Sequence, residues 1–158
     1  MAVTRVAYEA DGWGVGELWL DDGVVVWHEL PKATTLTDMS PVGDMSVNVV
    51  AGVQAYLAGE EVSLDDVPVD LDYETDFLTK CAHALRAIPR GETVTYGELA
   101  ALAGAPGAAR AAGSFCARNR LGLFVPCHRV VSAGGLGSYG SLGLEYKKRL
   151  LRLEGVAV

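Results

Sequence analysis

Long apolar stretches are missing from this chain of 158 residues. No run approaches the roughly 18 apolar residues that a membrane-spanning helix needs. The N-terminus also lacks the basic-then-apolar order of a secretory signal, because Arg5 is soon followed by Glu9 and Asp11. We therefore expect a cytoplasmic protein that makes no contact with a membrane.

Cysteine and histidine are both scarce, with three of each. Three thiols cannot all pair within one chain, and a reducing cytoplasm would keep them as thiols, so no disulfide framework is expected. Cys81 and His83 stand two positions apart on an expected helix and point to different faces, and His28 has no Cys or His close to it in sequence. We predict no metal site.

Residues 135–140 match the GxGxxG pattern of dinucleotide-binding loops. Such a loop should open a helix inside a strand-helix-strand unit near the start of a nucleotide domain, whereas here a single expected helix remains before the chain ends. We interpret the segment as a glycine-rich loop that is suited to bracket a base or a small ligand. We expect no cofactor.

Acidic residues outnumber basic ones, and the formal net charge of −7 by itself argues against a nucleic-acid partner. The excess is confined to one part of the chain. Residues 1–76 hold 2 basic and 16 acidic side chains, a balance of −14, whereas residues 77–158 hold 11 basic and 4 acidic ones, a balance of +7. Screening limits exposed charges to a reach of about 8–10 Å, so a basic lobe can dock on phosphates beside an acidic one. The alternative is a chance asymmetry of solvated surfaces.

The first lobe, residues 1–76, has the pattern of a small antiparallel sheet with one helix. Apolar residues recur as expected for strands at 3–8, 15–20 and 24–30. Helical spacing predicts a helix over 46–57, and the acidic segment that follows is interpreted as a solvated boundary between lobes.

The second lobe, residues 77–158, is predicted to be mainly helical, which makes the fold class α+β. A first helix is expected from Phe77, capped by Thr75 or Asp76. Two further helices, over 96–103 and 106–118, flank a glycine-containing turn and make a helix-turn-helix candidate.

The last expected helix spans residues 144–153 and has an amphipathic pattern. We expect Leu150 and Leu153 to face inward. The basic residues are expected to face largely outward: Lys147, Lys148 and Arg152.

Cys127 follows Pro126 and precedes the pair His128-Arg129. The thiolate is the nucleophilic form of cysteine, and nearby positive charge favours it. The apolar stretch 121–125 predicts a buried strand with Cys127 at its mouth, so that His128 would reach the thiol through a water. A buried structural cysteine is the alternative interpretation.

Four arginines lie near Cys127 in sequence, while residues 99–144 contain no acidic side chain. This window predicts a surface that faces phosphates, with the third helix of the second lobe placed in a groove of the nucleic acid. The alternative is an alanine-rich helix packed in the core. The four residues are Arg110, Arg118, Arg120 and Arg129.

Several segments together resemble one family. They are the run 91–100 (GETVTYGELA), Arg110-Ala111, Asn119, the run 126–131 (PCHRVV) and the segment 153–155 (LEG). The pattern is similar to that of the O6-alkylguanine-DNA alkyltransferases, closely over residues 77–155. In the first lobe the resemblance is limited to the expected sheet and helix.

The resemblance implies single-turnover repair of double-stranded DNA that contains O6-alkylguanine, with O4 of thymine as a second candidate substrate. Cys127 would take the alkyl group and keep it as a thioether. His128 would act through a water as base toward Cys127, and Glu154 would orient His128. Tyr96 would protonate a ring nitrogen of guanine, and Asn119 would brace the active-site turn.

The resemblance also assigns residues to the DNA. Arg110 would fill the gap that the extruded nucleotide leaves in the duplex. The other DNA-binding positions are Thr95, Ala111, Ser114 and Arg118. The Val130 carbonyl and the loop at Tyr139 and Gly140 would bracket the flipped base, and the protein would act as a monomer.

Two other functions compete with alkyl transfer. A protein that binds alkylated DNA without transferring anything is expected to lack the cysteine, which is present here as Cys127. A hydrolase with a Cys-His pair would need an oxyanion site and would turn over. The chain also departs from the family pattern, because Ser114, Phe115 and Cys116 are bulkier than expected and Arg120 replaces a common proline.

Overall fold

The computed structural model describes residues 3–33 and 44–158, with the side chains of 44–47 left aside. The chain divides into two compact units. The first unit comprises Met1–Asp70 and Arg120–Phe124, and the second comprises Leu71–Asn119 and Val125–Val158. The antiparallel sheet of the first unit and the helices of both confirm the predicted α+β class.

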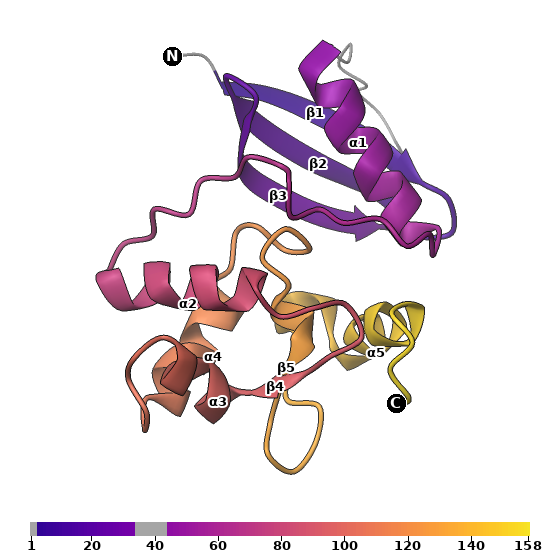
Figure 1. Ribbon diagram of the computed structural model, residues 1–158. Coiled ribbons are helices and arrows are strands. Elements are labelled where there is room, and N and C mark those ends of the chain that lie inside the picture. Colours follow the sequence, from indigo (N-terminus) through magenta and orange to yellow (C-terminus); the bar gives the residue numbers. More distant parts are fainter. Residues whose placement is uncertain (1–2, 34–43) are drawn as a thin grey trace. The chain divides into compact units, whose positions relative to one another are not determined.

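The first unit is built on a sheet of three antiparallel strands in the order β1-β2-β3 (Figure 1). The strands are β1 (Val3–Ala10), β2 (Gly14–Asp21) and β3 (Val24–Lys32), each somewhat longer than predicted. Buried and more exposed residues alternate along β2, because successive side chains of a strand point to opposite faces, whereas β1 buries Val6, Ala7 and Tyr8 in succession. The helix α1 (Asp44–Leu57) covers one face of this sheet.

The core of the first unit lies between α1 and the sheet. Val6, Leu18 and Val25 point into it from the strands, and Val53 points into it from the helix. The indole of Trp13 joins the β1–β2 turn to the helix, because its Nε1 donates to the carbonyl of Leu57 at 2.9 Å.

The segment 120–124 is buried in the first unit, but the predicted strand over 121–125 is wrong. Only an isolated bridge between His28 and Leu121 has strand-like pairing, and Leu123 has a φ of 73°, which is left-handed. A short apolar run signals burial rather than a particular backbone shape, so periodicity alone does not separate a buried turn from a buried strand.

The second unit begins with α2 (Asp76–Arg86), whose first turn is capped as predicted, since Thr75 Oγ1 accepts from the backbone N–H of Leu78 at 3.2 Å. The short strand β4 (Val94–Thr95) then leads directly into α3 (Tyr96–Leu102). Thr95 and Glu98 form a capping box at the start of α3.

α4 (Ala109–Ala117) packs against α3 across a glycine-containing turn, as expected for a helix-turn-helix pair. It begins three residues later than predicted. Gly107 has a φ of 93°, which a helix cannot contain, so Pro106 belongs to the turn instead of the first helical turn.

The rest of the second unit carries the segments around Cys127. A 3₁₀ turn, η1 (Cys127–Arg129), leads into β5 (Val130–Val131), which pairs in parallel with β4. After a second 3₁₀ turn, η2 (Gly140–Leu142), the chain ends with α5 (Leu144–Leu153), which has the predicted bounds.

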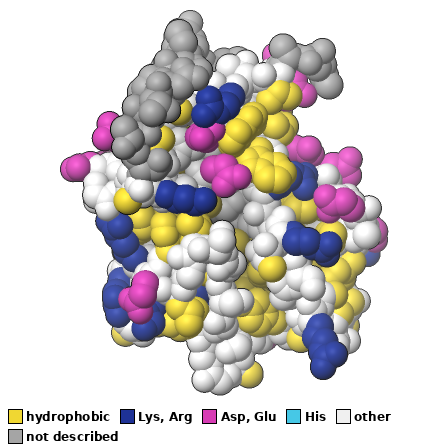
Figure 2. Space-filling view, turned by 180° about the vertical axis from the view of Figure 1, so that it is seen from behind, with side chains coloured by type: hydrophobic (Ala, Val, Ile, Leu, Met, Phe, Trp, Pro, Cys, Tyr) yellow, Lys and Arg dark blue, Asp and Glu magenta, His cyan; other side chains and the backbone are white. Residues whose placement is uncertain are grey.

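No helix among the described residues is long and apolar enough to cross a membrane. The surface mixes side chains of all kinds, and Figure 2 shows acidic, basic and apolar groups on one face of the molecule. The apolar side chains that reach solvent include Trp27, which is 45% exposed, and Leu102, which is 59% exposed.

Candidate functional site around Cys127

Cys127 lies in the 3₁₀ turn η1, where it is 7% exposed. Its backbone N–H donates to the carbonyl of Val125 at 2.8 Å, which closes a tight turn around Pro126. Burial raises the pKa of the Cys127 thiol, while a hydrogen bond with Asn119, the charge of Lys147 and a hydrogen bond with Tyr139 act in the opposite direction. Since burial dominates, the resting group is the thiol, and a base is needed to generate the nucleophile.

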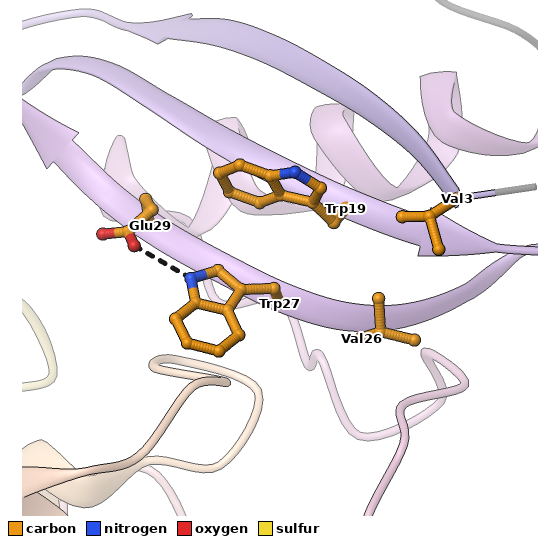
Figure 3. A pocket seen from close by; sticks show the side chains of 5 residues that line it. All are labelled: Val3, Trp19, Val26, Trp27 and Glu29. Atoms are coloured by element: carbon orange, nitrogen blue, oxygen red, sulfur yellow. Dashed lines mark hydrogen bonds between the residues drawn. The ribbon is translucent and has the colours of Figure 1, made fainter.

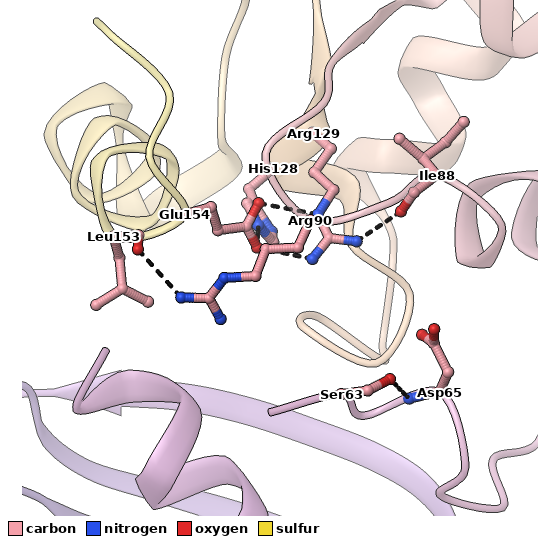
Figure 4. Close-up of polar contacts among 8 residues, drawn as sticks. All are labelled: Ser63, Asp65, Ile88, Arg90, His128, Arg129, Leu153 and Glu154. Carbon is pink, nitrogen blue, oxygen red and sulfur yellow. Dashed lines mark hydrogen bonds and ion pairs between the residues drawn. The ribbon is translucent and has the colours of Figure 1, made fainter. Parts of the chain in front are cut away.

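His128, Arg129 and Glu154 form a buried network next to Cys127 (Figure 4). Nε2 of His128 lies 2.9 Å from Oε2 of Glu154. Arg129 donates two hydrogen bonds to the same carboxylate, from Nε at 2.9 Å and from Nη2 at 2.7 Å. Its Nη1 donates to the carbonyl of Ile88 at 2.7 Å. Glu154, the residue that follows α5, therefore joins the C-terminal end of that helix to η1.

The phosphate-facing role predicted for Arg129 is wrong. Its side chain is only 10% exposed and its guanidinium is bound to Glu154. The sequence analysis also predicted that positive charge near Cys127 favours the thiolate. Arg129 is a poor source of that charge, because the carboxylate of Glu154 neutralises its guanidinium. Bidentate binding by arginine instead fixes where the carboxylate points.

The contact with Glu154 determines the protonation pattern of His128. Burial lowers the pKa of His128 despite the nearby carboxylate, so the ring is neutral at pH 7. A carboxylate only accepts, so the ring proton of the neutral form lies on Nε2. The buried Nδ1 then has a lone pair and can act as a base.

Asn119 closes the segment that precedes Cys127. Its Nδ2 donates to the carbonyl of Val125 at 2.8 Å, and its Oδ1 accepts from the hydroxyl of Tyr73 at 2.9 Å. These two partners fix the orientation of the amide, and they leave Asn119 able to hydrogen-bond Cys127 as well. Asn119 thus ties the Tyr73 side chain to the backbone two residues before Cys127.

Lys147 is the important residue of the site that the sequence interpretation missed. The side chain predicted to point outward is completely buried. Its Nζ donates to the carbonyls of Val130 at 2.6 Å and Ser138 at 3.1 Å, and lies 5.8 Å from the centre of the Tyr96 ring. Burial lowers its pKa, while negative charge on Cys127 or Cys116, in the thiolate form, acts to raise it.

The helical spacing of α5 contained the signal for Lys147. Positions 147, 150, 151 and 154 recur at intervals of three and four, and all four residues are buried. A lysine within an otherwise buried stripe is normally expected to extend its amine to water, which is why it was placed outside. Here backbone carbonyls replace the water.

Tyr96 packs against the glycine-rich loop 135–140 in the second unit. The hydroxyl of Tyr96 accepts from the backbone N–H of Ser138 at 3.4 Å. A Cβ on Gly137 would lie 2.5 Å from that hydroxyl, and Gly137 has a φ of 79°, so glycine is required at this point. The loop thus closely follows the surface of the tyrosine.

Of the residues assigned to a flipped base, Tyr139 and Gly140 end this loop and Val130 precedes it. The Val130 carbonyl accepts a hydrogen bond from Lys147, and the ring of Tyr139 lies tilted against that of Tyr146, with ring centres 6.1 Å apart. Tyr139 is also among the side chains that act to lower the pKa of the Cys127 thiol. Gly140 is exposed, with a φ of 54°.

The outer face of α4 carries most of the positions assigned to DNA. Arg110, Ser114 and Arg118 follow one another at intervals of four and are all exposed, as is Ala111. The opposite face packs inward through Ala112 and Phe115, which excludes an entirely buried α4. Thr95, the last residue of β4, is half-buried, and its hydroxyl caps the start of α3.

Arg120 is separate from that face, against the sequence prediction. It belongs to the first unit, where its Nη2 donates to the backbone carbonyl of Asp70 at 3.2 Å and lies 3.7 Å from the carboxylate of the same residue. The prediction failed because nearness in sequence to Arg118 does not carry over to the fold when the chain changes units between them.

The first unit has a pocket of its own, of about 430 Å³, on the outward face of the sheet (Figure 3). It shares no residue with the site around Cys127. Trp19 and Trp27, which are directly paired across β2 and β3, lie between two valines and a carboxylate. The lining residues are Val3, Trp19, Val26, Trp27 and Glu29. Within the described parts of the chain, no group of three or more His, Cys, Asp or Glu side chains could hold a metal ion.

Known proteins resemble the chain over both units. A family model described as "6-O-methylguanine DNA methyltransferase, DNA binding domain" matches residues 76–156. The methylated-DNA–protein-cysteine methyltransferase of Mycobacterium leprae is 45% identical over 116 residues, which are 72% of this chain and 68% of that protein. The protein of that name from Methanothermobacter thermautotrophicus is 35% identical over 145 residues, covering 91% of this chain and 81% of that protein.

Solved structures extend the likeness to the fold. A crystal structure of Mycobacterium tuberculosis OGT in complex with DNA has a TM-score of 0.79 and 38% sequence identity, and the match covers 95% of this chain and 91% of that one. A crystal structure of Mycobacterium tuberculosis O6-methylguanine methyltransferase has a TM-score of 0.83 with 34% identity, and covers 99% and 96% of the two chains.

Proposed function

Because the chain belongs to the O6-methylguanine-DNA methyltransferase family, we propose that it repairs DNA by moving an alkyl group from O6 of guanine to Cys127 in a single turnover. The observation that carries this proposal is the buried Cys127 in the turn η1, followed directly by His128, whose buried ring has its Nε2 2.9 Å from Oε2 of Glu154. The DNA-binding and alkyl-transfer domain is proposed to span residues 77–158, beside an N-terminal domain of residues 1–76.

The proposed reaction is a displacement at the alkyl carbon. Nδ1 of His128 takes the thiol proton through a water, and the Cys127 sulfur attacks the alkyl carbon. The bond from that carbon to O6 breaks, its electron pair stays on the guanine, and Tyr96 supplies a proton to the ring nitrogen. Guanine and an S-alkylcysteine result, and a thioether has no ordinary hydrolytic exit. The neutral tautomer of His128, held by Glu154, supports its part in this scheme.

DNA is proposed to dock on the exposed face of α4. Arg118 would contact phosphate, together with Thr95, Ala111 and Ser114. A guanine inside the stack is out of reach of a buried thiol, so the nucleotide must be extruded, which costs a few kcal/mol. Arg110 would offset part of this cost by filling the gap in the duplex. Val130, Tyr139 and Gly140 would receive the base.

We also propose that the protein acts as a monomer. A cytoplasmic location is proposed as well, supported by three cysteines that are all free thiols.

The proposal is tested by counting repaired lesions. Duplex DNA containing O6-methylguanine is incubated with limiting protein, and the remaining lesion is quantified after digestion to nucleosides. One lesion should disappear per protein molecule, and no more on longer incubation. O4-methylthymine in the same duplex tests the second candidate substrate. Repeated turnover would indicate a hydrolase, and selective binding without loss of the lesion would indicate a non-catalytic lesion-binding protein.

A further inference from the structure

The turn that carries Cys127 is continuous with a segment of the other unit. The chain leaves the second unit after Asn119, contributes residues 120–124 to the first unit, and returns at Val125. Asn119 and Val125 are themselves joined by a hydrogen bond of 2.8 Å, so the segment is a loop closed at its base. The loop is covalently continuous with Asn119 on one side and, through Val125 and Pro126, with Cys127 on the other.

His28 of β3 holds this loop through its backbone and its ring. The backbone N–H of His28 donates to the carbonyl of Arg120 at 2.8 Å, and its Nδ1 lies 2.6 Å from the carbonyl of Gly122. A carbonyl only accepts, so Nδ1 is the protonated ring nitrogen. Nε2 of the neutral ring can then accept from the hydroxyl of Tyr8, which lies 2.6 Å away.

Packing fixes the same loop around the imidazole. The ring of Phe124 meets that of His28 edge-on with centres 5.2 Å apart, and Leu121 and Phe124 are at most 1% exposed. Gly122 packs so closely that an added Cβ would lie 2.4 Å from a methyl group of Leu30. His28 is 3% exposed, so its hydrogen bonds form away from competing water.

We propose that His28 is a positioning residue for alkyl transfer: by binding the loop 120–124 it sets the position of Asn119 and Cys127. This inference rests on the proposed roles of Asn119 and Cys127. A polar, directional anchor specifies the position of the Gly122 carbonyl more closely than apolar packing does. Displacement of a reacting group by about 1 Å can cost a hundredfold in rate, so such precision matters for a group that reacts with an extruded base.

The test uses the full-length protein and the single-turnover rate constant for methyl transfer at saturating O6-methylguanine duplex. His28→Ala removes both hydrogen bonds, His28→Asn can keep the donor to Gly122, and Tyr8→Phe removes only the hydroxyl. Trp27→Ala, an exposed neighbour on the same strand, is the matched control. Circular dichroism establishes that each variant is folded at the assay temperature, and affinity for undamaged duplex is measured in parallel.

We expect His28→Ala to transfer at least about tenfold more slowly while binding undamaged DNA normally, with partial rescue in His28→Asn and a smaller loss in Tyr8→Phe. The pH at which Cys127 reacts half-maximally with iodoacetamide should shift in the same order, which a purely structural role would not cause. If His28→Ala does not fold, the ordering of His28→Asn and Tyr8→Phe decides the question. Folded variants that transfer at the wild-type rate would overturn the inference, whereas wild-type protein that transfers nothing would overturn the proposed function instead.

Discussion

Glu154 and His128 lie 2.9 Å apart, with both side chains shielded from solvent. The carboxylate comes from the residue after α5, and the imidazole comes from the turn that holds Cys127. Arg129 binds the same carboxylate, so one buried negative charge serves both the orientation of the imidazole and the neutralisation of a buried guanidinium. This double use makes Glu154 important for both stability and reactivity.

Replacing Glu154 with alanine should lower the free energy of unfolding by about 3–5 kcal/mol, because Arg129 would remain as a buried charge without its carboxylate. Urea denaturation at pH 7 measures this loss. Glu145→Ala is the control, since that residue is exposed on α5 and should change stability by no more than about 0.5 kcal/mol. Equal effects for the two substitutions would contradict the assignment of a buried ion pair.

Replacing Lys147 with methionine should raise the pKa of Cys127, because the positive charge that lowers it is lost. The rate of alkylation by iodoacetamide, followed from pH 6 to pH 10, reports this pKa. The profile of Lys147→Met should move to higher pH, and methyl transfer at pH 7 should slow. Lys148→Met removes the adjacent lysine, which pairs with Glu145, and should leave the profile unchanged. If the pH profile of alkylation is the same in Lys147→Met as in the wild type, the charge of Lys147 does not affect the pKa of Cys127.

The stability of the protein should fall in mild acid partly because of His28. Burial lowers its pKa from 6.5 to about 4, so between these values the unfolded chain binds a proton that the native protein does not. Stability from this group is therefore complete above pH 6.5 and is lost as the pH falls toward 4, by up to about 3 kcal/mol. Urea denaturation at pH 7 and pH 4.5 should show a smaller difference for His28→Asn than for wild type. The same pH dependence in both would contradict the prediction.

Replacing Arg118 with alanine should weaken binding to undamaged duplex and reduce the slope of log affinity against log salt by about 0.9, as expected for one lost phosphate contact. Fluorescence anisotropy at several salt concentrations measures the slope. Arg149→Ala removes an equally exposed positive charge from α5 and should leave the slope unchanged. If both substitutions reduce it equally, the duplex does not dock specifically on α4.

The sequence predicted the regular elements well, because their signals are local. The strands β1–β3 were recognised from short runs of apolar residues. The cap at Thr75 and the amphipathic pattern over 144–153 likewise depend on residues that are close together in sequence. The resemblance to one family rested on the same kind of short, well-spaced motifs, and the family assignment is confirmed.

The failures concern residues whose partners are distant in sequence. The pairing of Arg129 with Glu154 was not recognised because the two residues are 25 positions apart, and Arg129 was therefore expected to face phosphate. Lys147 was expected to extend into water because its carbonyl partners lie outside α5. The buried turn at Leu121 could not be recognised because its partner is His28, more than ninety residues earlier. The local sequence pattern indicates which residues are buried or exposed, but the tertiary fold decides which atoms a charged or polar group contacts.

The central claim is that Cys127 is the alkyl acceptor, and intact-protein mass spectrometry tests it most directly. The protein is incubated with an O6-methylguanine duplex, and peptide mapping locates any added group, with Cys127→Ser as the control. We predict a stoichiometric gain of one methyl group on Cys127 and none in the control. A methyl group on Cys81 or Cys116, or transfer that persists in Cys127→Ser, would contradict the account.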